Sequence, residues 1–593
     1  MKRWIERRLA QRDERGIAAL LVALMTGTLF MGCAAMGVDV SRWYVEVQRV
    51  QKAADAAATA GVTYLPGDFA KAQAKALAIA ALNGYGNDTN SSVTVSLGAK
   101  PTQLVVTVSS TVANSFANAL GVPTTTVARS ATADYVGPAP MGSPCNSFGN
   151  ESDPAGSVND GVHGPTTKVT VNPAGGATCG GSTFWAAIAG PDTKKGNGDQ
   201  IASRTCDSGT DGCSGTTNTD FNPEGYFYLV RVGDAAVNHA ITLQIYDPAW
   251  ISTGDTCEKS PTGISSTANP WVSPGVSTRY PTTPTNYCTG DVDNTSSGKD
   301  YPITTSYGLR SPVDTSVPDQ APPVPGCEKQ YTGYAGYQPS SSVTMQSPWG
   351  LSASTLVSPT NGPVNQVATT FHQWVTFCTF TPTTAGDYYL QVRTDVAAAG
   401  TSDGNGGLVG NAKVYTQTGD DTSVHGTGNN RFALRVVGDT TVTSSVSVAG
   451  LNHMGIYANY TGGSPTFNLV RVIPAAATKT LVINFFDVGD ASQAGTVQVL
   501  PPSDSNLGSS LTTCQASGVA NGNINNCLLT NVSSSNYNGK NQQLSVQIPP
   551  TYTCQSSQAG GCWFRVKMSF PGGLDDTTTW SAQISGDPVR LIE

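Results

Sequence analysis

The sequence predicts a mainly β protein with an N-terminal transmembrane helix, followed by a small α/β stalk and two disulfide-bonded β-sandwich-like regions. Three observations support this fold class. Charged residues fill only 12% of the 593 positions, about half the share of an average soluble protein, while Gly fills 64 positions and Pro 36. Residues 17–38 form one uncharged apolar run. Twelve of the 13 cysteines lie between positions 145 and 562.

The N-terminal segment predicts a membrane anchor. Residues 1–16 are basic, and the 22 uncharged residues of 17–38 would span about 33 Å as a helix, enough for a bilayer core. Because the cations precede the span, we expect residues 1–16 in the cytoplasm and the bulk of the chain outside the cell membrane. The alternatives are cleavage at the small-x-small sequence Ala35-Met36-Gly37 and lipid attachment at Cys33.

Residues 39–136 predict the helical stalk, a small α+β domain. Apolar residues recur every three or four positions through 41–61, so one helix is expected to continue out of the membrane. The elements expected after it are a helix over 69–83, strands over 92–97 and 104–109, a helical segment over 111–120 and a strand over 127–135.

The cysteines beyond position 145 favour disulfides. They are even in number and none forms a C-x-x-C pair; the closest neighbours are Cys206/Cys213 and Cys554/Cys562. An even set in an exported region is typical of a disulfide framework, so six disulfides are expected, with the pairing left open. Zinc is the alternative, although the five histidines show no ligand spacing with the cysteines.

Three stretches of the N-terminal region resemble TadG-like proteins. They are Glu14-Arg15-Gly16 before the apolar run, Val38-Asp39-Val40-Ser41-Arg42 after it, and Gln51-Lys52-Ala53-Ala54-Asp55-Ala56-Ala57 in the expected helix. TadG-like proteins belong to the Tad (tight adherence) machinery, which assembles Flp-type pili and is a branch of type IV pilus systems. The resemblance is confined to about residues 10–135.

This resemblance implies an accessory or minor component of pilus assembly that contacts the membrane and pilin-like or pilus-assembly proteins. The sequence departs from the family in two places. The fifth residue after Gly16 is Leu21, where processed pilin-like members carry Glu. No Asp-x-Ser-x-Ser triplet occurs, so the metal site of a von Willebrand A domain is not expected.

Residues 145–440 and 441–593 predict the two sandwich regions, the first with an insertion near 311–326. Short strands alternate with Gly, Pro, Asn and Ser turns, as in β-sandwiches. An internal repeat appears at a shift of 240 residues: eight of the 21 positions 227–247 are identical in 467–487, including Arg231 and Arg471. Similar units are therefore expected in both halves. The arginines are interpreted as structural ion pairs, with Asp247 and Asp487 as suggested partners; a paired ligand-binding site is the alternative.

No pattern predicts catalysis. Gly400-Thr401-Ser402-Asp403-Gly404 matches G-x-S-x-G, but it opens a Gly-rich loop, whereas a nucleophile elbow joins a strand to a helix. The acidic loops at 291–294, 403–407 and 420–421 are interpreted as solvated turns, with calcium as the alternative. Five tryptophans fit sandwich cores or a carbohydrate surface equally well: Trp185, Trp250, Trp271, Trp349 and Trp374.

We therefore expect no catalytic, cofactor-binding or metal-binding residues and no enzyme activity. The net charge of −8 argues against a nucleic-acid partner. The expected function is a structural and interaction role in Flp-type pilus assembly. A surface adhesin that shares only the anchor is the alternative, and an exported hydrolase is a more remote one.

Overall fold

A computed structural model of the protein describes residues 2–65, 69–99, 103–135, 139–149, 184–250, 291, 303–312, 318–333, 370, 374–403, 406–415, 421–460, 463–556, 560–584 and 589–592. The chain forms two compact units. The first unit comprises Met1–Gly137 with Gly586–Glu593, and the second comprises Pro138–Ser585.

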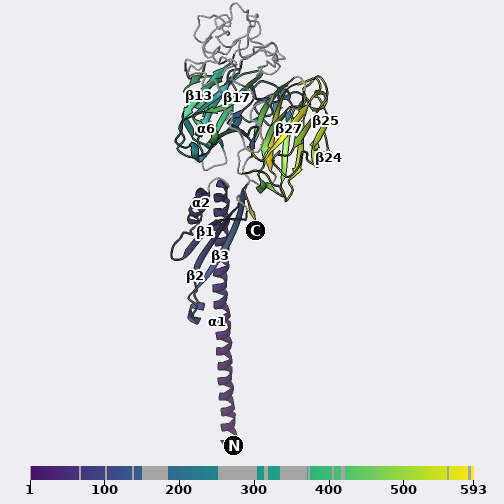
Figure 1. Ribbon diagram of the computed structural model, residues 1–593. Helices are drawn as coiled ribbons and strands as arrows, with labels where there is room; N and C mark the ends of the chain where they lie inside the picture. The colour runs from purple at the N-terminus through teal and green to yellow at the C-terminus, as the bar shows by residue number, and fades with distance from the viewer. Residues whose placement is uncertain are drawn as a thin grey trace, which may run out of the picture. The chain divides into compact units, whose positions relative to one another are not determined.

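The first unit is a long helix packed on a four-stranded antiparallel sheet. Helix α1 (Lys2–Gly61) continues without a break from the apolar run into the stalk, as the sequence predicts. Figure 1 shows the strands along its C-terminal half, with its N-terminal half extending past them. The sheet order is β1-β2-β3-β29, and the unit's other elements are η1 (Val62–Tyr64), α2 (Phe69–Leu82), β1 (Ser91–Leu97), β2 (Gln103–Ala113), the 3-10 helix η2 (Ala117–Leu120), β3 (Thr124–Tyr135) and β29 (Val589–Ile592).

Small side chains allow α1 to pack closely. Ala54 and Ala57 of α1 are fully buried in one apolar cluster with Ala76 of α2 and Leu104 of β2. Gly61 marks the tightest point: a Cβ atom there would lie 2.6 Å from Leu104 Cδ2 and 2.7 Å from the Ala72 carbonyl oxygen. The Ala-rich sequence thus serves close packing of two helices on a sheet as well as helix propensity.

The apolar part of α1 is exposed. Leu20, Leu24 and Phe30 have exposed fractions of 69%, 63% and 70%. Among the described residues, α1 is the one helix that is long and apolar enough to cross a membrane. An apolar surface of this length on a helix is favourable in lipid and costly in water.

Two expectations for the first unit need correction. The helical segment expected over 111–120 is wrong for most of its length: Thr111 and Val112 continue β2 opposite Thr126 and Thr125 of β3, and only η2 is helical. Side chains branched at Cβ favour this extended ladder. The region expected over 441–593 ends earlier, because β29 pairs with β3 in the first unit. This pairing occupies what would otherwise be an open sheet edge.

The second unit is built from antiparallel strands with short helical turns. Figure 1 shows two neighbouring groups of strands, one with β13 and β17 and the other with β24, β25 and β27. The described strands of residues 140–451 are β4 (Pro140–Met141), β5 (Ser147–Phe148), β6 (Phe184–Ala189), β7 (Cys213–Ser214), β8 (Thr217–Asn218), β9 (Tyr226–Val232), β10 (Ile241–Tyr246), β11 (Thr304–Arg310), β12 (Pro323–Thr332), β13 (Trp374–Phe380), β14 (Gly386–Arg393), β15 (Thr401–Ser402), β16 (Leu408–Val409), β17 (Asn429–Val437) and β18 (Val446–Leu451).

The later strands of this unit are β19 (His453–Tyr460), β20 (Thr466–Arg471), β21 (Thr480–Phe486), β22 (Gly495–Leu500), β23 (Thr513–Gly518), β24 (Gly522–Asn525), β25 (Leu528–Val532), β26 (Asn541–Gln547), β27 (Trp563–Ser569) and β28 (Leu574–Ile584). Among the described residues of this unit, the helices are α6 (Thr440–Ser445) and α7 (Ser534–Tyr537), with 3-10 turns η3 (Lys195–Asn197), η4 (Asp234–Ala236), η5 (Pro318–Gln320), η6 (Ala412–Tyr415) and η7 (Pro474–Ala476). One apolar core contains buried side chains from both repeat copies, such as Leu243 and Ile483.

The repeat at a shift of 240 residues is visible in the backbone. In each copy a strand leads through a 3-10 turn into a second strand: β9, η4 and β10 in one, β20, η7 and β21 in the other. Matching positions share left-handed φ angles, 65° and 70° at Asn238 and Thr478, and 52° and 63° at Asp247 and Asp487. The core face is preserved as well, since Ile241 and Leu481 are both fully buried.

Disulfides form in the strands and loops of the second unit. The described pairs are Cys206–Cys213, Cys327–Cys378, Cys514–Cys527 and Cys554–Cys562. Cys145 is also disulfide-bonded, whereas Cys33 in α1 is free. Cys179, Cys257 and Cys288 lie outside the described residues. Disulfides rather than zinc therefore account for the described cysteines beyond position 145.

Candidate functional site

The first candidate site is the carboxylate of Asp39, the residue that directly follows the apolar run. Its side chain has an exposed fraction of 1%. Oδ1 accepts a hydrogen bond from the Ser115 backbone N–H at 2.9 Å, and Oδ2 accepts from Phe116 and Ala117 at 2.9 and 2.7 Å. One side chain of α1 therefore binds the three backbone amides that lead into η2, and fixes the β2–β3 loop to the helix.

Electrostatics fit this arrangement. Backbone donors, the Ala117 amide first, hold the pKa of the Asp39 carboxyl below its ordinary value, and the nearby Arg42 guanidinium lowers it further. The carboxylate thus stays ionised at neutral pH, where it accepts its three hydrogen bonds most strongly.

The contact continues along the next two turns of α1. The Arg42 guanidinium donates to Ser115 Oγ, and Trp43 Nε1 donates to Asn114 Oδ1 at 2.8 Å. One turn further, Glu46 Oε1 accepts from Ser110 Oγ at 2.7 Å and from the Tyr85 hydroxyl at 3.1 Å. We call this set of contacts from Asp39 to Glu46 the polar clamp. It connects one face of α1 to the end of β2 and to the loop beyond it.

A groove of about 650 Å³ runs beside the polar clamp on α1. Its lining combines small, apolar and charged side chains from the helix with one residue of β2: Gly37, Val38, Ser41, Arg42, Val45, Glu46, Arg49 and Val112. Val38 and Val45 are each 48% exposed. The groove begins where the apolar run ends, so it lies on the part of α1 closest to the expected membrane surface.

The same stretch of chain decides the comparison with known proteins. Residues 16–74 match the Tad family model. That model describes a putative Flp pilus-assembly TadE/G-like region, and it covers the apolar run, the polar-clamp residues of α1 and the start of α2. Neither a curated protein nor a solved structure matches the chain. The Tad resemblance is thereby confirmed for the N-terminal region alone.

The structure gives physical roles to the Tad-like stretches. Asp39 and Arg42, the ends of the Asp-x-x-Arg pattern, both contact Ser115 in the β2–β3 loop. In the Gln-x-x-Ala-Asp-Ala-Ala pattern, Gln51 Nε2 donates to Asp55 Oδ1 at 2.8 Å, and Ala54 and Ala57 are buried in the cluster with α2 and the sheet. The sequence pattern marks these residues of α1 but not their partners, because 114–117 carry no pattern of their own.

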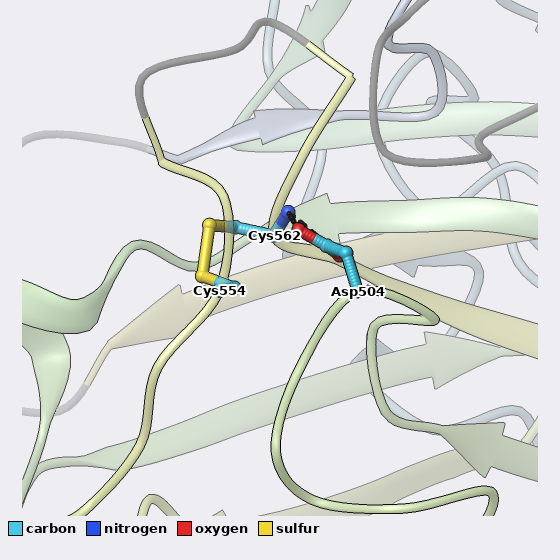
Figure 2. A group of neighbouring side chains, drawn as sticks. All are labelled: Asp504, Cys554 and Cys562. Carbon is cyan, nitrogen blue, oxygen red and sulfur yellow. Dashed lines mark hydrogen bonds between the residues drawn. A yellow bond between two sulfur atoms is a disulfide. The ribbon is translucent and has the colours of Figure 1, made fainter.

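A second cluster has metal-type side chains but lacks the chemistry of a metal site. Within the described part of the chain, Asp504, Cys554 and Cys562 are the one group of three such residues whose ligand atoms lie within 4.8 Å of one another. Figure 2 shows the two cysteines joined in a disulfide, which removes their thiolates as ligands. The Asp504 carboxylate accepts from the backbone amides of Gln555 and Cys562 at 2.8 and 3.1 Å. This cluster closes the 554–562 loop.

The two repeated arginines have different partners. Arg231 forms a two-pronged ion pair with Asp387, its direct neighbour on β14, at 2.7 and 2.9 Å. Arg471 donates to the carbonyl oxygens of Gly561 and Ser556. The suggestion that Asp247 and Asp487 are the partners of these arginines is therefore wrong. The interpretation of Arg231 as a structural ion pair agrees with this geometry.

The remaining sequence candidates lie in structural positions. Ser402 belongs to the β15–β16 hairpin, so a strand rather than a helix follows it. Asp403 pairs with Lys329 at 2.8 Å, and Asp291 accepts from the Arg431 backbone N–H. The described tryptophans Trp185, Trp250 and Trp374 are buried, which favours the core interpretation over a carbohydrate surface. Trp271, Trp349, Asp420 and positions 292–294 lie outside the described residues.

Sequence reasoning missed a group of buried carboxyls near the end of β21. Asp487 and Asp576 are 1% and 2% exposed, and Thr578 Oγ1 lies 3.3 Å from both the Asp487 carbonyl oxygen and Asp576 Oδ2. Burial raises the pKa of Asp576 to about 8, and the neighbouring Asp490 contributes. The signal in the sequence is the Asp that follows the second strand of each copy, Asp247 or Asp487. From the sequence, both are interpreted as ion-pair partners of the repeated arginines.

Proposed function

We propose that this protein is an accessory or minor component of Flp-type pilus assembly that acts by binding other proteins, without catalysis. Helix α1 holds it in the cell membrane, with residues 1–16 in the cytoplasm and the β-rich second unit outside. The observation that carries this proposal is the Tad match over residues 16–74, the region that combines the apolar run with the polar clamp.

Pilin-like or pilus-assembly proteins are the partners that we propose for the groove on α1. Its lining combines the exposed Val38 and Val45 with the charged side chains of Arg42, Glu46 and Arg49. This mixture suits the side of another membrane-anchored helix. A photo-crosslinking amino acid at Val45 is expected to capture a pilus protein in intact cells. The matched control is the same amino acid at Leu97, which is equally exposed, at 48%, at the far end of β1.

The experiment that tests the function is deletion of the gene, followed by counting surface pili by electron microscopy with the full-length gene as rescue. Lost pili that the rescue restores would support assembly. Normal pilus numbers would overturn the proposal. The second unit would then be screened for specific binding to glycans, matrix or cells, the behaviour expected of an adhesin.

A further inference from the structure

The β2–β3 loop, residues 114–123, presents two exposed apolar side chains, one on each side of its turn. Phe116 and Val122 are each 48% exposed. The loop lies in a stretch of 28 residues, 101–128, that contains no charged side chain. An exposed Phe and Val on an uncharged loop form a surface that water solvates poorly.

The polar clamp fixes the height of this loop along α1. Glu46 contacts Ser110, Trp43 contacts Asn114, and Asp39 contacts 115–117. Steps along α1 toward the apolar run therefore correspond to steps along β2 toward the loop tip. The Phe116 backbone nitrogen lies 2.9 Å from the carboxylate of Asp39. Asp39 is the residue directly after the last apolar residue of the run.

The apolar run fixes where the membrane surface lies. Its length of about 33 Å matches a hydrocarbon core of about 30 Å, so Val38 must lie near the edge of the core. Aromatic residues support this position, since Trp43 and the 65% exposed Tyr44 occupy the next turn of α1. Trp and Tyr prefer this boundary between lipid and water.

The charged side chains of α1 beside the loop do not oppose its contact with lipid. The Asp39 carboxylate is buried and accepts three backbone hydrogen bonds, so it does not have to face the bilayer unpaired. Arg42 donates to Ser115 and can also meet lipid phosphates at the headgroup level. A loop with apolar side chains and uncharged neighbours can enter the boundary between headgroups and acyl chains at little cost.

We infer that the β2–β3 loop inserts Phe116 and Val122 into the interface of the bilayer that α1 crosses. The protein then contacts the membrane at two places, the span and this loop, with the polar clamp joining them. Two contacts restrict the tilt and rotation of α1, and so set the orientation in which the groove on the helix faces its neighbours.

The test uses the full-length protein with Cys33→Ser, reconstituted into vesicles of phosphatidylethanolamine and phosphatidylglycerol. A single cysteine is introduced as Phe116→Cys or Val122→Cys and labelled with an environment-sensitive fluorophore. Lipids brominated near the headgroup end of the acyl chain then serve as quenchers. Leu97→Cys is the matched control, because Leu97 has the same exposed fraction of 48% at the opposite end of the sheet.

Insertion predicts a blue-shifted spectrum and several-fold stronger quenching at positions 116 and 122 than at 97. Quenching equal to that of the Leu97→Cys control would overturn the inference. The inference would also be overturned by a labelled loop that is shielded from water in cells but not in vesicles that contain no other protein, because a protein partner would then cover it. Neither result depends on whether pili are lost on gene deletion.

Discussion

Asp39 stabilises the contact between α1 and the β2–β3 loop through more bonds than any neighbouring residue of the polar clamp. Replacing it with Ala removes the acceptor of three backbone amides, which must then find water or remain unpaired. We expect amide exchange of residues 115–117 to rise about tenfold or more. Hydrogen exchange with mass spectrometry would measure this change.

The control for Asp39→Ala is Asp55→Ala, which removes the same group from the same helix. Asp55 accepts a hydrogen bond from Gln51, which lies within α1 itself. Its loss is expected to leave exchange at 115–117 unchanged. Equal exchange in the two variants would show that the loop is held by other contacts.

Asp576 gives the second residue-scale prediction, because burial raises its pKa to about 8. A carboxyl whose pKa is raised on folding favours the folded state while it stays protonated. That contribution is fully present below the ordinary pKa near 3.8 and is lost as the pH rises toward 8. Asp487 shifts in the same direction, mainly by burial and next by the charge of Asp576.

The free energy of unfolding of the second unit is therefore expected to decrease by an amount on the order of a few kcal/mol as the pH rises from 5 to 8. Its thermal midpoint should decrease over the same range. Asp576→Asn keeps an acceptor for the Gly489 amide and removes the charge, so its midpoint should depend less on pH. Asp234→Asn, at an exposed position, is the control. Parallel pH profiles of Asp576→Asn and the wild type would contradict this account.

At the scale of elements, the periodicity and composition of the sequence predict the helices and strands that local interactions determine. The continuous helix, the Ala-rich second helix and the strands before and after the β2–β3 loop follow from periodicity and β-branching. The helix expected over 111–120 failed because strand pairing with β3 outweighs the local pattern there. The partner of Arg231 could not be predicted either, since Asp387 is its neighbour only through the pairing of β9 with β14, which local sequence does not specify.

Gly61 carries the prediction for the packing of α1 against α2. Gly61→Ala places a methyl group within 2.7 Å of Leu104 Cδ2 and the Ala72 carbonyl oxygen. Because backbone cannot yield as a flexible side chain does, overpacking should destabilise the first unit by about 1–3 kcal/mol. Faster hydrogen exchange in α2 would report it.

Gly37→Ala is the matched control, because a Cβ atom at Gly37 meets nothing within 4 Å. There the gain in helix propensity acts alone, so the helix should be unchanged or about 1 kcal/mol more stable. A Gly61→Ala variant that behaves like Gly37→Ala would mean that the helices separate easily, and that the close contact is not needed for folding.

At the scale of the whole molecule, the chain begins and ends in the same unit. Residues of β29 pair with β3 from Val589↔Tyr135 to Ile592↔Thr132, although the second unit lies between them in sequence. Such closure could not be predicted from composition, because a four-residue strand has no periodicity of its own. The strand covers the outer edge of β3 at positions 132–135, which would otherwise be an open sheet edge.

Removal of residues 589–593 tests what this closure contributes. The deletion leaves the second unit and the helices intact, but it opens the edge of β3 at positions 132–135, so hydrogen exchange should rise several-fold in that part of the strand. Exchange in Ser91–Leu97, on the opposite edge, should stay constant and serves as the internal reference. Deletion of Glu593 alone is the matched control. Because positions 132–135 lie at the end of β3 away from the β2–β3 loop, and Asp39 holds that loop directly, lipid quenching at Phe116→Cys should stay unchanged in the same truncated protein.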